Sequence, residues 1–449
     1  MIRFAARLRA EGMSEHEALA KAGMFARCAA ALGALQPPPV EQGDPFAFFV
    51  PGRIEVLGKH TDYAGGRSLL CAMERGFAVL AQPRADDRVR TIAVASGEIR
   101  EVTPDTDIES VPGDWSAYVR TVARRIMRDF PSARRGADMA FDSDLPAASG
   151  MSSSSALVIA VFLALDAANE LQSDPTYRRF ITSREVLGNY LGAVENGRDF
   201  GAFAGGEGVG TLGGSQDQTA ILCCRAGMLS RYSFCPVRAE GEIPFPEDRA
   251  FVVAYSGVAA EKTSNARLRY NEASLAVVEI LVLWNAATGR SDASLGDAVS
   301  SGAEAPDALR AVLRDSRSPN FAAQRLLDRF EQFAAESCDI IPRAADAFAR
   351  GDLAAIGVEV HRSQRGVERL LGNQVPETIA LARLAREHGA DAASAFGAGF
   401  GGSVWALVAE ERAEMFASAW RRAYRTEFPE AATRAEFIVT RPGPGAMRL

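Results

Sequence analysis

Hydrophobic and polar residues follow two kinds of spacing along the chain, and the spacing changes near residue 46. Residues 3–34 have helical spacing and are rich in Ala, Glu and Arg. From Phe46 to Ala95, short apolar or alternating runs are separated by Gly, Pro and Asp, which predicts strands of one mixed or antiparallel sheet. Helical spacing returns at 115–130, and residues 137–143 are typical of another strand. The first third is therefore predicted to be a helical segment followed by a sheet.

The rest of the chain continues this mixture. Helices are predicted after the serines at 152–155 and at 183–196, and strands at 219–224, 228–234 and 250–256. A mostly helical block follows, with helices at 265–286, 321–348, 353–371 and 377–388. The chain closes with a strand, a glycine turn, a second strand, a helix to about residue 424 and a strand at 437–441. We expect an α+β protein with a helical extension at 1–45 and two domains at 46–245 and 246–449. The prolines at 37–39 are predicted to end the helical extension.

Composition narrows the class of protein. The chain of 449 residues is 47% hydrophobic and 24% charged, which is typical of a globular protein. A net charge of −7 argues against nucleic acid as a partner. The six cysteines lack C-x-x-C spacing, which indicates a reducing compartment and no zinc site. The sequence shows neither a signal peptide nor a membrane-spanning run, so we expect a cytoplasmic protein without membrane partners, as a monomer or weak homo-oligomer.

The stretch LPAASGMSSSSALVIA at 145–160 carries the first candidate chemistry. Its glycine and small side chains precede a predicted helix, whose first N–H groups are unpaired and carry partial positive charge. An anion could approach this backbone closely, so Gly150, Met151, Ser152, Ser153, Ser154 and Ser155 are a candidate phosphate cradle. No lysine follows the glycine, so this is not a G-x-x-x-x-G-K-[ST] loop. Taken alone, a serine-rich helix cap is the simpler interpretation.

Three further clusters each have a functional and a simpler interpretation. PGRIEVLGKHTDYAGG at 51–66 places polar side chains on a turn between strands, where they could bind a polyol or form a charged surface turn. GGSQDQ at 213–218 places Asp217 between two glutamines, where it could be a general base or a solvated turn residue. SAFGAGFGGS at 394–403 is a glycine turn that a ligand or another chain segment approaches closely.

The order of these clusters resembles that of the GHMP kinases, the superfamily of galactokinase, homoserine kinase and mevalonate kinase. GRIEVLGKHTDYAGG resembles the galactokinase signature GR-x-N-x-x-G-E-H-T-D-Y-x-x-G, and PAASGMSSSSA resembles the phosphate loop P-x-G-x-G-L-S-S-S-A. GSQDQ and FGAGFGGS resemble the galactokinase segments G-I-M-D-Q and T-G-A-G-F-G-G-C, and VPET at 375–378 resembles C-P-E-L. The resemblance spans about residues 46–440, and the HTDY turn is specific to the galactokinase branch.

The resemblance implies a fold and an activity. The fold would be the two-domain GHMP kinase fold, with a ribosomal protein S5 domain 2-like N-terminal domain, a ferredoxin-like C-terminal domain and the active site between them. The activity would be ATP-dependent phosphorylation of the anomeric hydroxyl of galactose or a related sugar. The cofactors would be ATP, bound by residues 150–155, and Mg²⁺, bound by Ser154 and Glu195.

The resemblance also implies roles for individual side chains. Asp217 would be the catalytic base or orienter of the sugar hydroxyl, and Arg53 would stabilise the Asp217 carboxylate and the charge on the phosphoryl group. Asp62 would bind sugar ring hydroxyls. The other residues implied in sugar binding are Lys59, His60, Tyr63, Gly214, Tyr270, Gly399 and Gly401.

Three departures from the family pattern matter. Lys59 replaces a glutamate that accepts a hydrogen bond from the C6 hydroxyl, and a lysine can only donate. Either the substrate carries a hydrogen-bond acceptor or an anion near C6, as galacturonate does, or Lys59 points to solvent and the substrate is galactose. Glu55 replaces an asparagine. The 22 positions from Glu195 to Asp217 exceed the family norm, which predicts an enlarged glycine-rich loop at 201–214 beside the site.

Two other functions stay open at this point. A non-catalytic sugar or ATP sensor is one alternative, because some galactokinase-like proteins are sensors. A kinase for an isoprenoid or amino-acid alcohol is the other, and the HTDY turn argues against it.

Overall fold

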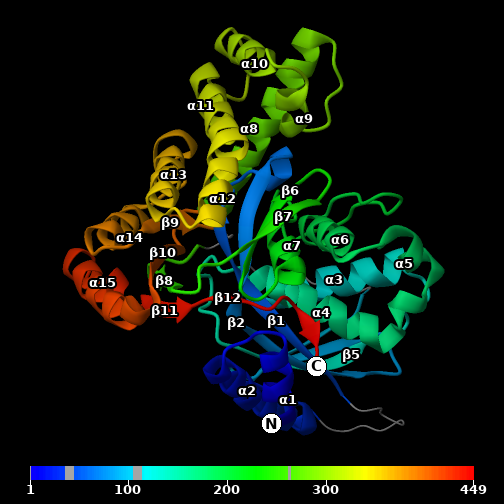
Figure 1. Cartoon of the computed structure of the whole chain (residues 1–449). Coiled ribbons are helices and arrows are strands. Elements are labelled where there is room, and N and C mark those ends of the chain that lie inside the picture. Colours follow the sequence, from blue (N-terminus) through cyan, green and yellow to red (C-terminus); the bar gives the residue numbers. More distant parts are fainter. Residues whose placement is uncertain (1, 36–44, 105–113, 261–263) are drawn as a thin grey trace.

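The computed structural model describes residues 2–35, 45–104, 114–260 and 264–449, and it contains two sheets with helices packed around them (Figure 1). The prolines at 37–39, predicted to end the N-terminal extension, lie outside the described residues. The predicted α+β class is confirmed. None of the described helices is long and apolar enough to cross a membrane.

Within the described residues the first sheet has nine strands, and its main path runs β13-β1-β2-β5-β3-β4. Neighbouring strands are antiparallel except for β3 and β5, which are parallel. The hairpin of β6 and β7 extends one end of β2, and β12 also pairs with β2. The strands are β1 (Phe46–Leu57), β2 (Arg67–Pro83), β3 (Val89–Ala93), β4 (Glu98–Val102), β5 (Ala137–Ser143), β6 (Met228–Ser233), β7 (Arg238–Pro244), β12 (Pro442–Gly443) and β13 (Met447–Arg448).

Helices cover both faces of this sheet, because residues along β1 and β2 alternate between two cores. Phe48 and Val79 belong to the core beneath α3 (Ser116–Asp129) and α4 (Ser153–Asn169). Phe49 and Leu80 belong to the core beneath α1 (Ile2–Ala10) and α2 (Glu15–Ala34). The predicted N-terminal helices are therefore an integral layer of the fold. Three further helices, α5 (Pro175–Phe180), α6 (Arg184–Asn196) and α7 (Gln216–Cys223), lie on the α4 side in Figure 1.

The strand predicted at 219–224 is wrong, because these residues form most of α7. The run Thr-Ala-Ile-Leu-Cys-Cys is short and apolar, and such a run is compatible with a buried strand or a buried helix. Packing against α6, β1 and β2 decides for the helix. The correction matters because Asp217 is then in the first turn of a helix.

The second sheet has four antiparallel strands in the order β11-β8-β10-β9. With two helices on one face, this is the order of the predicted ferredoxin-like domain. Trp405 on β10 and Trp420 on α15 are fully buried beside it. The elements are β8 (Arg249–Tyr255), β9 (Ala392–Phe396), β10 (Ser403–Ala409), β11 (Glu436–Thr440), α14 (Pro376–Glu387) and α15 (Ala413–Glu427).

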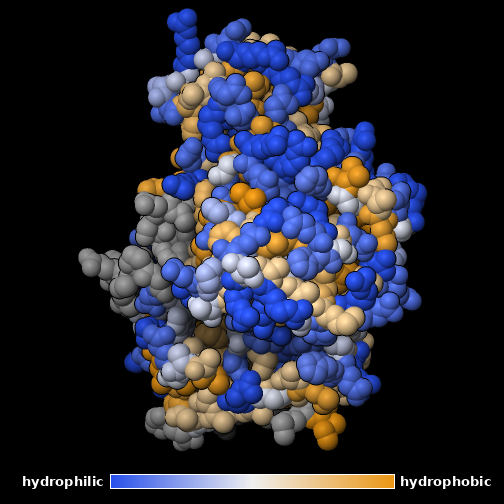
Figure 2. Space-filling view, turned by 90° about the vertical axis from the view of Figure 1, so that its left-hand side faces the viewer, coloured by the Kyte–Doolittle hydropathy of each residue, from blue (hydrophilic) through white to orange (hydrophobic). Residues whose placement is uncertain are grey.

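After β8, the helices α8 (Ser264–Thr288), α9 (Leu295–Ser300), α10 (Ala305–Arg314) and α11 (Ala323–Ala334) project from the two sheets at the top of Figure 1. The helices α12 (Ile341–Arg350) and α13 (Leu353–Gly366) follow, and they pack against β7 and β9. The predicted helix at 321–348 is interrupted by a π-helical turn, Ala335–Ile340, and a second π-helical turn, Val367–Leu371, follows α13. Hydrophilic residues are spread over the face of the molecule shown in Figure 2.

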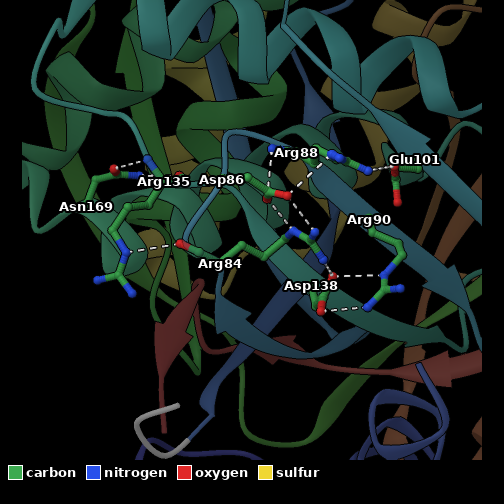
Figure 3. Close-up of polar contacts among 8 residues, drawn as sticks. All are labelled: Arg84, Asp86, Arg88, Arg90, Glu101, Arg135, Asp138 and Asn169. Atoms are coloured by element: carbon green, nitrogen blue, oxygen red, sulfur yellow. Dashed lines mark hydrogen bonds and ion pairs between the residues drawn. The ribbon is translucent and has the colours of Figure 1, made fainter. Parts of the chain in front are cut away.

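An ion-pair cluster lies where β3 meets β5 (Figure 3). Asp138 on β5 accepts hydrogen bonds from Arg84 and Arg90, at 2.8 and 2.9 Å. Arg84 also binds Asp86. The pairs fix the connection between β2 and β3, so this cluster is structural. The predicted domain limits, 46–245 and 246–449, stay a prediction: residue 246 falls between β7 and β8, while residues 442–448 return to the first sheet.

Candidate active site

An arginine and a carboxylate meet where the two sheets approach each other. Arg53 Nε on β1 donates to Asp217 Oδ1 at 2.9 Å, and Arg53 Nη1 donates to the carbonyl oxygen of Gly150 at 2.6 Å. The Arg53 guanidinium also lies over the ring of Phe396, at the end of β9. One buried side chain therefore joins the Asp217 helix, the serine stretch and the second sheet.

The serine stretch is not a simple cap on α4. Ser152 occupies the N-cap position with a left-handed φ of 63°, and its side chain forms no capping hydrogen bond. Ser152 Oγ and Ser149 Oγ are buried and have no hydrogen-bond partner. Buried hydroxyls are usually paired, so two orphaned ones beside a helix N-terminus fit an anionic group that binds there. Residues 150–155 therefore fit the phosphates of a nucleotide.

The glycine turn between β9 and β10 packs on this serine stretch. Ser403 Oγ donates to the carbonyl oxygen of Ser149 at 2.7 Å, and a Cβ on Gly397 would lie 2.8 Å from the carbonyl oxygen of Gly150. Other chain segments approach the remaining glycines: a Cβ on Gly399 would overlap Asn373, and one on Gly401 would lie 2.6 Å from the carbonyl oxygen of Val258. Close packing by the chain itself therefore accounts for both glycines.

Glu195 lies behind the serine stretch on α6. Its Oε2 accepts hydrogen bonds from Ser155 Oγ at 2.8 Å and from Gln218 Nε2 at 2.6 Å. Glu195 is 2% exposed, and these two hydrogen bonds orient its carboxylate. Serine and carboxylate oxygens are the hard ligands that Mg²⁺ prefers. The described residues contain no group of three or more His, Cys, Asp or Glu side chains that could hold a metal by themselves.

The turn after β1 brings Asp62 against the GGSQDQ segment. Asp62 Oδ2 accepts from the backbone N–H of Gln216 at 3.1 Å, and a Cβ on Gly214 would overlap this carboxylate. Burial raises the pKa of Asp62, and the N–H of Gln216 opposes the rise. Asp62 and Gly214 are thus brought together beside Asp217, as one site requires.

His60 and Tyr63 form the other side of this turn. His60 Nδ1 and the Tyr63 hydroxyl are 2.8 Å apart, and His60 Nε2 is 3.1 Å from the carbonyl oxygen of Ala398. Burial and the nearby Arg329 lower the pKa of His60 to about 4. The ring of Tyr270, on α8, lies 5.0 Å from the His60 ring. His60 is therefore neutral at physiological pH and links residues 59–63 to the glycine turn.

Comparison with known families now gives these contacts a context. Three family models match the chain: the galactokinase galactose-binding signature at residues 40–83, the GHMP kinase N-terminal domain at 117–224 and the GHMP kinase C-terminal domain at 344–426. Together they cover more than half of the chain. The chain belongs to the GHMP kinases, in the galactokinase branch.

Individual relatives agree with this assignment. A galactokinase of Chloroflexus aggregans is 29% identical over 384 residues, which is 83% of this chain and 86% of that protein. A galactokinase of Actinobacillus pleuropneumoniae is 40% identical over 113 residues, 25% of this chain and 29% of its own. The structure of Lactococcus lactis galactokinase complexed with galactose matches with a TM-score of 0.73 and 25% identity, over 90% of this chain and 95% of that one.

More distant kinases share the fold alone. L. major mevalonate kinase in complex with R-mevalonate matches with a TM-score of 0.54 and 13% identity, over 91% of this chain and 98% of that one. The predicted GHMP kinase fold is therefore confirmed, with the Arg53–Asp217 pair between its two sheets.

Lys59, which replaces the glutamate of galactokinases, is fully buried, so the predicted alternative in which it points to solvent is wrong. Lys59 Nζ donates to Ser363 Oγ on α13 at 3.0 Å, and Ser363 Oγ donates to Glu336 Oε1 at 3.0 Å. The same Glu336 oxygen accepts from the N–H of Gly58 at 2.8 Å. The Glu336 carboxylate of this GHMP kinase therefore offsets the positive charge of the buried Lys59 ammonium through the Ser363 hydroxyl.

Glu55, which replaces the galactokinase asparagine, lies on β1 beside the pair. Gln216 Nε2 donates to Glu55 Oε2 at 2.7 Å, while Glu55 Oε1 is buried without a partner. Burial raises the pKa of Glu55 to about 7, although the charges of Arg53 and Lys59 oppose the rise. This position is therefore held by a carboxyl group that titrates near neutrality.

Sequence reasoning missed the residues that hold the site from a distance. Gln216 and Gln218, the amides on either side of Asp217, bind Glu55 and Glu195, and their place in the GSQDQ motif was the available signal. Arg329 and Ser363 lie on the α-helices α11 and α13, and Glu336 lies in the π-helical turn Ala335–Ile340. Arg329 Nη2 donates to the carbonyl oxygen of His60 at 2.5 Å. No local pattern marks these three residues.

Proposed function

We propose that this GHMP kinase is an ATP-dependent galactokinase, which transfers the γ-phosphoryl group of ATP to the anomeric hydroxyl of galactose. The observation that carries the proposal is the contact of Arg53 with both Asp217 and Gly150. It places a carboxylate that can accept a proton beside the loop that fits a nucleotide. The galactose-binding signature and the galactokinase relatives support the choice of sugar.

In this proposal the chain mainly positions and neutralises charge, which is what phosphoryl transfer requires. ATP supplies the phosphoryl group, and the first turn of α4 with residues 150–155 would hold its phosphates. Ser154 and Glu195 would hold Mg²⁺, which would offset phosphate charge, and Ser155 and Gln218 would orient Glu195.

The Asp217 carboxylate would accept the proton of the anomeric hydroxyl, or orient that hydroxyl. Arg53 binds Oδ1 and favours the ionised form of Asp217. Asp62 would bind ring hydroxyls, and His60, Tyr63, Gly214 and Tyr270 would shape the pocket around the sugar. Lys59, Gly399 and Gly401 would support this pocket from behind, because they pack on the chain itself.

Galactose fits this site better than galacturonate. An anionic sugar would be needed if Lys59 lacked an anion, but Glu336 already offsets its charge through Ser363. The sensor alternative has no observation in its favour, because the pair of Asp217 and Arg53 that the proposed transfer uses is intact. A cytoplasmic location, where ATP is available, and a monomer or weak homo-oligomer complete the proposal.

The test is ADP release from ATP and Mg²⁺ over a panel of neutral hexoses and uronates, with the sugar phosphate identified by phosphorus NMR. We expect turnover with galactose, an anomeric phosphate as product and no turnover with galacturonate. Thermal stabilisation by galactose without ADP release would contradict the proposal and indicate a sensor. Turnover of galacturonate alone would contradict the choice of sugar.

A further inference from the structure

The glycine-rich residues 197–214, called the connecting loop from here on, join the helix of Glu195 to the helix of Asp217. The first half of this loop is anchored to α3. Arg125 Nη1 donates to the carbonyl oxygen of Arg198 and Arg128 Nη1 to that of Gly205, both at 2.9 Å. Phe203 is buried, with its ring 5.4 Å from the Phe130 ring. This half belongs to the folded body of the protein.

The second half is fastened to α6 by one side chain. Asn196 Nδ2 donates to the carbonyl oxygens of Gly192 and Gly214, at 2.8 and 3.2 Å. Asn196 Oδ1 accepts from Thr211 Oγ1 and from the N–H of Gly213, both at 2.9 Å. Two donations and two acceptances use the whole hydrogen-bonding capacity of the amide. Asn196 therefore fixes residues 211–214 beside Glu195.

A second asparagine ties the loop to the projecting helices. Asn271 Oδ1, on α8, accepts from the N–H of Leu212 at 2.9 Å, and Asn271 Nδ2 donates to the carbonyl oxygen of Gly210 at 3.2 Å. The preceding residue on α8 is Tyr270, whose ring contacts His60. A Cβ on Gly213 would lie 2.8 Å from the Tyr270 hydroxyl. Tyr270 therefore contacts both the connecting loop and the turn of residues 58–66.

We propose that the connecting loop is a fixed wall of the sugar site and that Asn271 is a positioning residue, which holds Tyr270 against that wall. This inference rests on the proposed galactokinase function. Tyr270 lies in the second turn of α8, directly before Asn271. The two hydrogen bonds of Asn271 to the loop hold this turn of the helix, and with it Tyr270, in place. Sugar binding therefore depends on a residue that does not touch the sugar.

The experiment compares Asn271→Ala with Asn285→Ala in the full-length protein. Asn285 is a matched control, because it lies on the same helix and also forms two hydrogen bonds to a backbone, with the N–H and carbonyl oxygen of Asp292, both at 3.0 Å. We expect Asn271→Ala to raise the KM for galactose about tenfold, with kcat and the KM for ATP within about twofold. Asn285→Ala should leave all three constants unchanged.

Asn271→Asp gives a graded test, because it keeps the acceptor for the N–H of Leu212 and loses the donor to Gly210. Its KM for galactose should lie between those of the wild type and Asn271→Ala. Amide hydrogen exchange gives a readout without activity: residues 209–214 should exchange faster in Asn271→Ala than in the wild type, and at the wild-type rate in Asn285→Ala.

Two results overturn the inference: equal galactose KM values for Asn271→Ala and Asn285→Ala, or equal exchange of residues 209–214 in these two variants. Failure of the proposed function looks different, because the wild type itself would then not phosphorylate galactose. The exchange comparison would still decide whether Asn271 holds the wall. If Asn271→Ala does not fold, Asn271→Asp carries the same two measurements.

Discussion

Arg53 and Asp217, 164 positions apart in the chain, meet at 2.9 Å between Nε and Oδ1. The arginine side chain is 4% exposed and the aspartate side chain 21%, so water reaches the carboxylate but hardly the guanidinium. A base for a sugar hydroxyl needs this asymmetry, since it must be held in place and still be within reach of the hydroxyl. The tertiary fold therefore brings together the two side chains that the proposed reaction uses.

Asp217→Asn tests this pair directly. The amide oxygen can still accept from Arg53 Nε, so the fold should survive with a loss of about 1–3 kcal/mol in the free energy of unfolding. The base is lost, so kcat should fall by about 10²–10⁴-fold while ATP binding is kept. Steady-state ADP release and ATP titration measure the two effects.

Asp248→Asn is the control for this substitution. Asp248 also pairs with an arginine, at 2.6 Å to Arg249, but its side chain is 78% exposed. This variant should keep the wild-type kcat. Unimpaired turnover in Asp217→Asn would show that Asp217 is not the catalytic base.

Gly214→Ala tests how closely the backbone must approach Asp62. A Cβ at this position would overlap the Asp62 carboxylate, so Asp62 or the GGSQDQ segment has to move. We expect the KM for galactose to rise by at least about tenfold, because misplacing a binding group by a fraction of an ångström weakens its hydrogen bonds.

Gly33→Ala is the matched glycine control. Gly33 lies in α2, and a Cβ there would meet nothing within 4 Å. This substitution should leave the KM unchanged and stabilise the protein by up to about 1 kcal/mol. A wild-type KM in Gly214→Ala would show that the carboxylate of Asp62 is free to move.

The glycine-rich motifs could be interpreted from the sequence, because each glycine marks a place where another group closely approaches the backbone. Gly214 against Asp62 and Gly397 against Gly150 are contacts of this kind, and both lie in stretches that the sequence selected. The arrangement of the two sheets followed from the alternation of strands and helices, and from the family resemblance.

The supporting residues could not be predicted in the same way. Glu336 and Ser363 lie on helices whose residues have ordinary helical spacing, and only the tertiary fold brings them to Lys59. Glu336 is part of a π-helical turn, and such a turn shifts the faces of a helix relative to a regular repeat. The error at 219–224 has a related cause, because a short apolar run takes its structure from its packing.

Lys59→Glu introduces the glutamate that galactokinases have at this position. We expect it to weaken both the fold and the turnover of galactose. It would bury a second carboxylate near Glu336 and remove the cation that this carboxylate faces. Breaking a buried charge arrangement costs about 3–5 kcal/mol, so the melting temperature and kcat/KM for galactose should both fall. Thermal melting and ADP release with galactose and galacturonate measure these effects.

Lys59→Met separates loss of the cation from gain of a carboxylate. It should melt at a higher temperature than Lys59→Glu, and Glu336→Gln should recover part of the loss when it is added to Lys59→Glu. Galacturonate turnover by the wild type that is abolished in Lys59→Met would contradict this reasoning, because Lys59 would then bind a substrate anion.

Glu55 makes stability depend on pH near neutrality. Burial raises the pKa of Glu55 from 4.5 to about 7 in the folded protein, so the folded state binds one more proton than the unfolded state between these values. Stability should therefore decrease as pH rises through this window, by up to about 3 kcal/mol. Glu55→Gln keeps an acceptor for Gln216 Nε2 and does not titrate, so it should be more stable than the wild type at pH 8 and similar to it at pH 5.

Denaturant unfolding at pH 5 and pH 8 measures this difference, and Glu411→Gln is the control. Glu411 is exposed, so its substitution should leave the pH dependence of the wild type intact. The same measurement also addresses the site. Glu55 shares Gln216 with the turn of Asp62, because the N–H of Gln216 binds Asp62 while its side chain binds Glu55. Deprotonation of Glu55 should then raise the KM for galactose in the wild type alone, and an equal KM rise in Glu55→Gln would assign that pH effect to another group.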